Sequence, residues 1–297
     1  MKTDIPSRTA QYMALFRAIE TARPSQKRLF DDPFASIFLD NRLKIIVKIS
    51  SVPPFGRLIS SIIQKKGPGA LSSGIARTKY IDDLLQQTSD DGVKQVIILG
   101  AGFDTRALRL KFLRNISVIE IDHPDTARFK IRKLKNIMDK SPRNVKYYQL
   151  DFNKQSLNNL ASKNNLDFDI PTTFIWEGVT NYLTQEAIDK TFQFIQKFQN
   201  VYVIFTYIDK IVLDYPKSFH GTEKIFKNLK ENEENWTYGF KPIELPEYLK
   251  KFDLIVIEDL GAEEYRNKYI SDKKNLLKGY EFYHVVFCKK KKKKKIV

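Results

Sequence analysis

Two glycines follow the first strongly apolar run of the chain, at a place where backbone atoms could contact a ligand. The run Val96–Leu99 leads directly into Gly100-Ala101-Gly102. Glycine lets the chain turn tightly and lets backbone N–H groups approach a ligand without a Cβ atom in between. The dinucleotide fingerprint G-x-G-x-x-G needs a third glycine, but Thr105 holds that place. The pair therefore indicates either a ligand-binding loop or a plain tight turn.

Acidic residues end the next apolar run. Asp122 lies 22 residues beyond Gly100, a distance at which a carboxylate can accept hydrogen bonds from ribose hydroxyls. Glu120 shares the same strand face, and we favour Asp122 because it is nearer the strand end. His123 follows it directly. Together with the glycine loop, Asp122 favours a bound nucleoside over a solvated carboxylate.

Two further runs end in polar side chains. Asp151 and Phe152 combine a hydrogen-bond acceptor with an aromatic face, which is what an adenine ring requires. Asp151 could equally be a helix N-cap. Glu177 and Gly178 follow the next run, where a carboxylate would lie beside a cationic group of a ligand, and Tyr182 would face the open, substrate side.

The elements that must position these residues alternate along the chain from Gln95 onward. Short apolar runs at 96–99, 116–121, 145–150, 173–176 and 201–205 alternate with helical stretches at 126–138, 155–161 and 185–198. Continuous apolar runs are typical of strands covered on both faces, so the pattern predicts an α/β, doubly wound, mostly parallel sheet. Runs at 254–257 and 283–287 predict an antiparallel pair at its edge.

The first third of the chain predicts helices. Apolar spacing indicates helices at 11–20 and 75–87, and Asp32-Pro33 predicts the start of another. Residues 43–63 are apolar on one side and basic on the other, which indicates a packed pair of amphipathic helices or, alternatively, a membrane-surface helix. We expect three regions: a helical cap (1–88), an α/β core (89–288) with an insertion near 210–244, and a lysine-rich tail (289–297).

The charge of +16 invites a nucleic-acid interpretation, but seven of the positive charges lie in the run Lys289–Lys295, which leaves +9 for the rest. A like-charge block repels itself, so we expect a solvated tail, with an acidic-surface binder as the alternative. Cys288 is the single cysteine, which excludes a disulfide framework and favours a buried thiol. The chain shows no secretion signal and no membrane span, so we expect a cytoplasmic protein.

With these residues assembled, the chain resembles the leucine carboxyl methyltransferase family, and its bacterial O-methyltransferase branch most of all. The resemblance extends over about the first 190 residues and rests on several short stretches: Arg17–Glu20, Asp32–Ala35, Ala76–Asp83, Gly100–Arg106, Glu120–Pro124, Leu150-Asp151 and Glu177–Leu183.

The resemblance implies a class I methyltransferase that uses S-adenosylmethionine (SAM) and releases S-adenosylhomocysteine, with a seven-stranded sheet under an N-terminal helical cap. Arg77 matches the arginine that holds the methionine carboxylate. Glu177 matches the residue near the methionine amino group, and Asp122 matches the ribose acceptor. Gly100 matches the backbone contact. Asp151 and Phe152 match the adenine contacts, and the expected cofactor site is completed by Ala101, Gly102, Asp104, His123 and Gly178.

The acceptor side is predicted less closely. We expect methyl transfer to an oxygen, with Arg17, Glu20 and Tyr182 lining the acceptor pocket and no metal. A carboxylate acceptor needs no base because it is ionised at neutral pH; for a hydroxyl acceptor Tyr182, Glu20 or His123 could serve. The eukaryotic phosphatase methyltransferases have a substrate-binding arginine where this chain has Asn153. That difference favours a small-molecule acceptor.

Three alternatives remain from the residues themselves. A nicotinamide-dependent oxidoreductase is disfavoured by the missing third glycine and by the long helical segment before the first strand. A basic nucleic-acid-binding or RNA-methylating protein would show steeply salt-dependent binding that survives removal of the lysine run. A third alternative is a protein that binds SAM without catalysis. The sequence does not define the oligomeric state.

Overall fold

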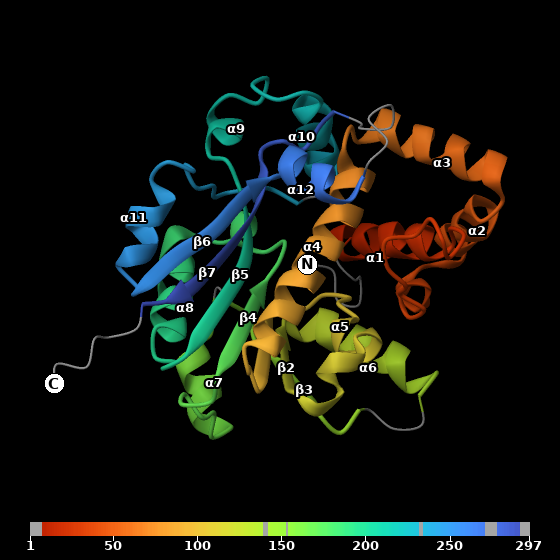
Figure 1. The fold of residues 1–297 in the computed structure, drawn as a ribbon. Helices are drawn as coiled ribbons and strands as arrows, with labels where there is room; N and C mark the ends of the chain where they lie inside the picture. Colours follow the sequence, from red (N-terminus) through yellow and green to blue (C-terminus); the bar gives the residue numbers. More distant parts are fainter. Residues whose placement is uncertain (1–7, 139–141, 153, 232–233, 271–277, 292–297) are drawn as a thin grey trace, which may run out of the picture.

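The computed structural model describes residues 8–138, 142–152, 154–231, 234–270 and 278–291, and its centre is one seven-stranded sheet (Figure 1). The strand order is β3-β2-β1-β4-β5-β7-β6. All neighbours pair in parallel except β7, which is antiparallel to both β5 and β6. The strands are β1 (Gln95–Leu99), β2 (Ser117–Asp122), β3 (Val145–Gln149), β4 (Thr172–Trp176), β5 (Val201–Ile208), β6 (Leu254–Gly261) and β7 (Tyr283–Lys290).

The doubly wound, mostly parallel α/β sheet expected from the sequence is confirmed, with one difference at its edge. The antiparallel strand β7 lies between β5 and β6, so the edge strand β6 runs parallel to β5. An apolar run predicts a strand but not the neighbour with which it pairs. Because β6 and β7 have similar apolar runs, the sequence does not show which of them lies next to β5. β7 also continues to Lys290, whose Nζ donates to the carbonyls of Gln196 (2.5 Å) and Phe198 (2.7 Å). The first two lysines of the run therefore belong to the sheet and not to a tail.

Helices cover both faces of the sheet because alternate strand side chains point to opposite sides. Val96 and Ile98 of β1 pack beneath α4, α5 and α12, and Ile97 and Leu99 pack beneath α7, α8 and α11. Cys288 is buried in β7, as expected. The covering helices are α4 (Ala70–Asp90), α5 (Arg106–Arg109), α6 (Pro124–Lys135), α7 (Leu157–Lys163), α8 (Gln185–Ile195), α11 (Leu245–Lys250) and α12 (Ala262–Tyr269), with short 3-10 helices η2 (Lys111–Asn115) and η3 (Thr180–Tyr182).

The N-terminal helices lie at one side of the sheet (Figure 1). They are α1 (Arg8–Thr21), α2 (Asn41–Ser50) and α3 (Pro53–Lys66). The helix predicted to start at Asp32-Pro33 was wrong in type: a short 3-10 helix, η1 (Ala35–Phe38), forms instead. The Asp32 carboxylate binds Arg17 Nε (2.8 Å) and Thr105 Oγ1 (2.6 Å), which holds this segment against the sheet.

Between β5 and β6 the chain leaves the sheet in a polar excursion. It contains α9 (Ile211–Asp214) and α10 (Thr222–Glu231) before α11. Its return path places Phe240 beside Asp209 in an isolated parallel bridge. None of the described helices has the length and the apolar character needed to cross a membrane.

The chain order produces a crevice between β1 and β4. From β1 the chain moves outward to β2 and β3, and from β4 it moves outward in the other direction to β5. Loops after β1 and β4 therefore diverge at the carboxyl edge of the sheet, which is where open α/β sheets bind ligands. The glycine loop and the segment beginning at Glu177 both start there.

Candidate active site

A cavity of about 890 Å³ lies at this crevice. Its floor is the glycine loop and the ends of β2, β3 and β4, and its walls come from α1, α4, η3 and the segment that follows α10. The cavity brings together most of the predicted site residues: Arg17, Arg77, Gly100, Ala101, Gly102, Asp104, Asp122, His123, Asp151, Phe152, Glu177, Gly178 and Tyr182.

The glycine loop has the backbone conformation that glycine favours. Gly100 has φ +64° and Gly102 has φ +49°. A Cβ atom on Gly100 would lie 2.3 Å from Cγ2 of Val179, because the loop after β4 packs directly on it. The loop is thus a tight turn, and this turn brings backbone atoms to the cavity.

Asp122 stands at the end of β2 and fastens the glycine loop. Its carboxylate accepts hydrogen bonds from the backbone N–H of Gly102 and of His123 (2.6 Å to His123). Burial raises the pKa of Asp122, and these backbone donors act in the opposite direction. Glu120, the other candidate, points beneath α6 and pairs with Lys130 Nζ at 2.5 Å. Burial raises the pKa of Glu120 to about 7 although Lys130 opposes the shift, and it does not line the cavity.

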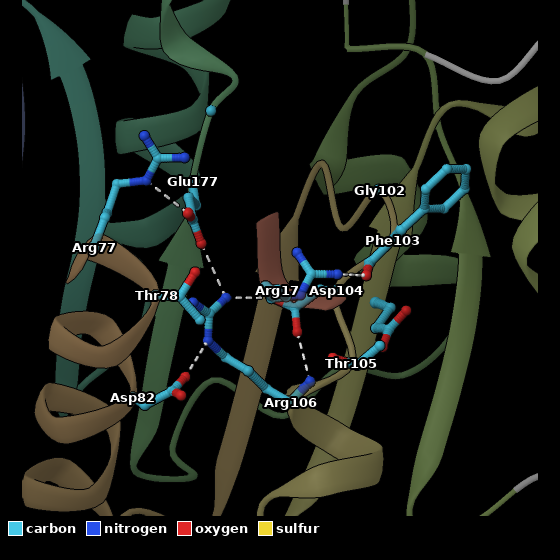
Figure 2. Close-up of polar contacts among 12 residues, drawn as sticks. Arg17, Arg77, Thr78, Asp82, Gly102, Phe103, Asp104, Thr105, Arg106 and Glu177 are labelled. Carbon is cyan, nitrogen blue, oxygen red and sulfur yellow. Dashed lines mark hydrogen bonds and ion pairs between the residues drawn. The ribbon is translucent and has the colours of Figure 1, made fainter. Parts of the chain in front are cut away.

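A network of buried charges crosses the crevice from α4 to the glycine loop. Arg77 Nε lies 2.8 Å from Glu177 Oε1, and Glu177 Oε2 lies 3.0 Å from Arg106 Nη1. Arg106 also binds Asp82 (2.8 Å) and Asp104. Figure 2 shows Glu177 between the two arginines. The alternating signs let each charge stay ionised out of water.

Two carboxylates of this charge network, Asp104 and Glu177, stay ionised despite their burial. Burial alone would raise the pKa of Asp104, but Arg106 and Lys130 lower it to about 2. Burial likewise opposes ionisation of Glu177, and Arg106 and Arg77 outweigh it, so the pKa of Glu177 is lowered. Arg77 also lies 4.6 Å from the ring centre of Tyr283, a cation–π contact that fixes its position.

Asp151 and Phe152 line the cavity beyond β3. The helix N-cap alternative for Asp151 is excluded, because α7 begins at Leu157 and its cap is Ser156, whose Oγ accepts from the N–H of Asn158. His123 caps α6, with Nδ1 accepting from Asp125 N at 3.4 Å, and its Nε2 lies 3.9 Å from Asp151.

The predicted acceptor residues separate into three environments. Tyr182 lines the cavity, and its hydroxyl lies 3.4 Å from Thr9 Oγ1 and 3.5 Å from Glu234 Oε2. Arg17 reaches the cavity, but its Nη2 donates to the carbonyl of Phe103 at 2.5 Å (Figure 2). Its Nε donates to Asp32, so Arg17 braces the glycine loop.

Glu20 is not brought to the cavity. It is fully buried about one turn beyond Arg17, near the end of α1, where Oε1 accepts from Leu29 N (2.6 Å) and Oε2 from Arg23 (2.8 Å). The expectation that Glu20 lines the acceptor pocket is therefore wrong. Helical spacing did not reveal this, because Glu20 shares a face of α1 with Met13 and Arg17 and differs only in lying further along the helix, where it binds the segment that follows. Asn153 lies outside the described residues.

Several cavity residues were not singled out in the sequence. Arg106 was named only as the last residue of the stretch Gly100–Arg106, one of those that carry the family resemblance. Glu234 and Trp236 belong to the polar excursion, and Thr9 and Met13 belong to α1. No local signal marks the last four, since they meet the site only through the fold. Among the described residues, no group of three or more His, Cys, Asp or Glu side chains could hold a metal ion.

The fold is that of the class I SAM-dependent methyltransferases. A structure described as a "putative methyltransferase" from Thermobifida fusca superimposes with a TM-score of 0.60 over 92% of this chain and 97% of its own, at 15% identity. A DUF574 family protein from Streptomyces avermitilis gives a TM-score of 0.57 over 92% of this chain and 100% of its own, at 10% identity.

The sequence places the chain within that class. A profile of the leucine carboxyl methyltransferase family matches residues 10–196, more than half of the chain, so the chain belongs to this family. It is 25% identical to Bacillus subtilis "Putative S-adenosyl-L-methionine-dependent methyltransferase YktD", over 98% of this chain and 100% of that protein. A similarly named Mycobacterium bovis BCG protein is 36% identical, but that match covers 59% of this chain and 58% of the relative.

Proposed function

We propose that this chain binds SAM in the cavity and transfers the methyl group to an oxygen of a small-molecule acceptor. The observation that carries the proposal is the Arg77–Glu177 pair, 2.8 Å apart, facing the glycine loop across the crevice. The methionine part of SAM carries one carboxylate and one ammonium group. The Arg77 guanidinium offers a positive charge for the carboxylate, and the Glu177 carboxylate offers a negative charge for the ammonium group. The cavity, about 890 Å³, lies within the usual size of cofactor sites.

The remaining residues fit a nucleoside at the other end of the cavity. Asp122 uses two lone-pair sites on backbone N–H groups, and a carboxylate has about four, so it can also accept from ribose hydroxyls. Asp151 and Phe152 supply an acceptor and an aromatic face for the base. Arg17 supports this half indirectly by holding Phe103 in place.

For methyl transfer the protein has to align the acceptor with the methyl group, enclose both away from water, and take the proton of a hydroxyl acceptor. SAM supplies a methyl group on a cationic sulfur, so the intrinsic reactivity belongs to the bound molecule. The chain's residues hold the acceptor oxygen in line with that methyl carbon and keep water out. SAM would supply the methyl carbon and keep the electron pair of the broken carbon–sulfur bond on its sulfur, while a hydroxyl acceptor would release its proton to a side chain of the protein.

We call the end of the cavity that is lined by Arg8, Thr9, Tyr182, Glu231 and Glu234 the acceptor half, and its charges favour a hydroxyl acceptor over a carboxylate acceptor. Its described charged side chains are Arg8, Glu231 and Glu234, so a carboxylate acceptor would meet more negative than positive charge. Burial raises the pKa of Tyr182, and the negative charge of Glu234 raises it further. Tyr182 therefore stays protonated and acts as a hydrogen-bond donor. Glu234 is the group positioned to accept the acceptor's proton, beside Tyr182 and Thr9.

Calorimetric titration with SAM tests the site. We expect Arg77→Ala and Asp122→Ala each to weaken SAM binding about 10- to 100-fold, the range for losing a hydrogen bond to a charged group. Arg128→Ala is the control, because Arg128 is half-exposed on α6 and does not line the cavity. Unchanged SAM affinity in both site variants would refute the assignment, and tighter binding of NAD than of SAM would favour the oxidoreductase alternative.

A further inference from the structure

Helices α2 and α3 carry apolar side chains on two sides. One set packs against the core formed by α1 and η1: Leu43, Ile46, Val47, Ile59 and Ile63. A second set is 43% to 57% exposed: Ile45, Ile49, Val52, Phe55, Leu58 and Ile62. No residue of α3 is buried, although half of its side chains are apolar. Packing on the protein therefore accounts for only one of the two apolar sets.

The exposed set follows helical spacing. In α2, Ile45 and Ile49 are four residues apart; in α3, Phe55, Leu58 and Ile62 are three and four apart. Residues with these separations share one face of a helix. Each helix thus presents neighbouring apolar side chains to solvent. A contiguous patch of this kind indicates a binding surface, whereas apolar residues scattered singly over a surface do not. In Figure 1 the pair lies at the right-hand edge of the molecule, beyond α1 and α4 as seen from the sheet.

The charges on this pair all have one sign. Residues 41–66 contain no Asp or Glu, and they contain six basic residues, all exposed: Arg42, Lys44, Lys48, Arg57, Lys65 and Lys66. On a helical wheel Lys44 and Lys48 lie on one side of the Ile45–Ile49 stripe, and Arg42 lies on the other. Basic side chains that flank an exposed apolar stripe are the pattern of helices that lie in the membrane interface.

We propose that the α2–α3 pair is a docking surface for an anionic phospholipid bilayer. The exposed isoleucines, Leu58 and Phe55 would enter the boundary between headgroups and acyl chains, and the six basic residues would contact lipid phosphates. A second copy of this chain fits the surface less well. A two-fold interface brings the same patch onto itself, so six positive charges would face six others, and no residue within 41–66 is acidic.

The pair is also joined to the wall of the cavity. Lys224 Nζ donates to the carbonyl of Lys65 (3.4 Å), and Asn228 Nδ2 donates to that of Lys66 (3.3 Å). Both donors belong to α10, which supplies Leu229 to the cavity lining. A bilayer held by α2 and α3 would thus lie one helix away from the acceptor half. Docking concerns this surface and does not depend on the proposed methyl transfer.

Cosedimentation of the full chain with vesicles tests the proposal. We expect binding to vesicles containing phosphatidylglycerol, little binding to pure phosphatidylcholine, and a decrease with salt. Ile45→Asp combined with Leu58→Asp should weaken partition into the anionic vesicles by about tenfold or more, because two apolar contacts become anionic. Both side chains are about half-exposed, so the circular dichroism spectrum should not change.

Two controls separate this surface from other causes. Ile243→Asp alters an apolar side chain that is 88% exposed elsewhere, and it should leave vesicle binding unchanged. A chain ending at Lys291 lacks most of the lysine run and should still bind. Binding by the double variant equal to that of the unaltered chain would overturn the proposal. So would a dimer, measured by analytical ultracentrifugation, that the double variant dissociates, since the surface would then join two copies.

Discussion

The carboxylates around the cavity differ in what faces them. Asp104 and Glu177 face arginines, Asp122 faces backbone N–H groups, and Glu234 faces two hydroxyls. A carboxylate paired with arginine keeps its charge and is a poor proton acceptor, because its pKa is low. Of these four, Glu234 is the one that lies in the acceptor half, where it contacts the hydroxyls of Thr9 and Tyr182.

This difference predicts the effect of replacing Glu234. Glu234→Gln keeps the size of the side chain but cannot take a proton, so we expect kcat for a hydroxyl acceptor to fall about 10²- to 10⁴-fold. SAM affinity should be unchanged, because Glu234 lies in the acceptor half. The measurement is S-adenosylhomocysteine formation with a panel of phenols, alcohols and carboxylic acids.

Glu231→Gln is the matched control, since Glu231 lines the same half and is not among the described partners of Tyr182 or Thr9. Faster turnover of carboxylic acids than of hydroxyl compounds by the unaltered chain would show that no proton acceptor is needed and that the hydroxyl preference is wrong.

Asp104 predicts an acid-dependent loss of stability. Its pKa in the folded chain is about 2, below the ordinary 3.8, so its stabilisation is complete above pH 3.8 and is lost as the pH falls to about 2. The shift corresponds to about 2 kcal/mol. Asp104→Asn should lack this component. Urea unfolding between the two pKa values should therefore show a smaller pH dependence in the variant than in the unaltered chain, and equal slopes would contradict the ion-pair explanation.

At the scale of elements, the crevice depends on how closely the loops after β1 and β4 approach. Gly100 permits this approach, since it combines a positive φ with a Cβ position only 2.3 Å from Val179 Cγ2. α4 then brings Arg77 to the same crevice from the other side, and α5 begins with Arg106. The loops after β1 and β4 and the helices α4 and α5 must therefore pack correctly before the network of buried charges can form.

Gly100→Ala should destabilise the chain by about 2–5 kcal/mol, because left-handed strain adds to a clash with Val179. Gly92→Ala isolates the strain: Gly92 has φ +91° and nothing within 4 Å of its Cβ position, so about 1–2 kcal/mol is expected. Urea unfolding gives both values. Equal losses in the two variants would mean that the contact with Val179 contributes nothing.

At the scale of the whole molecule, distant parts of the chain complete the acceptor half. Thr9 and Glu234 are hydrogen-bonded although 225 residues separate them. The positive charge is also distributed unevenly: seven of the net +16 lie in one run, and six basic residues lie on α2 and α3 without an acidic neighbour in 41–66. The overall charge is therefore better described as two local clusters than as a uniform nucleic-acid-binding surface.

The sequence by itself determined the strands, the glycine loop and most of the residues that line the cavity at the ends of the parallel strands. These are local properties: apolar runs form strands, glycines permit a turn, and polar residues at strand ends gather at one edge of a parallel sheet. Asp122, Asp151 and Glu177 could be found in this way, and Arg77 through the family resemblance.

Only the tertiary structure decided what depends on contacts between distant segments. It placed Glu20 beyond the cavity at the end of α1, inserted β7 between β5 and β6, and bound Arg17 to Phe103 beside the glycine loop. It also brought Glu234 and Thr9 to Tyr182, and it left one stripe of α2 and α3 uncovered. Side-chain direction and strand partners are fixed by long-range packing, and no window of the sequence contains both members of such a contact.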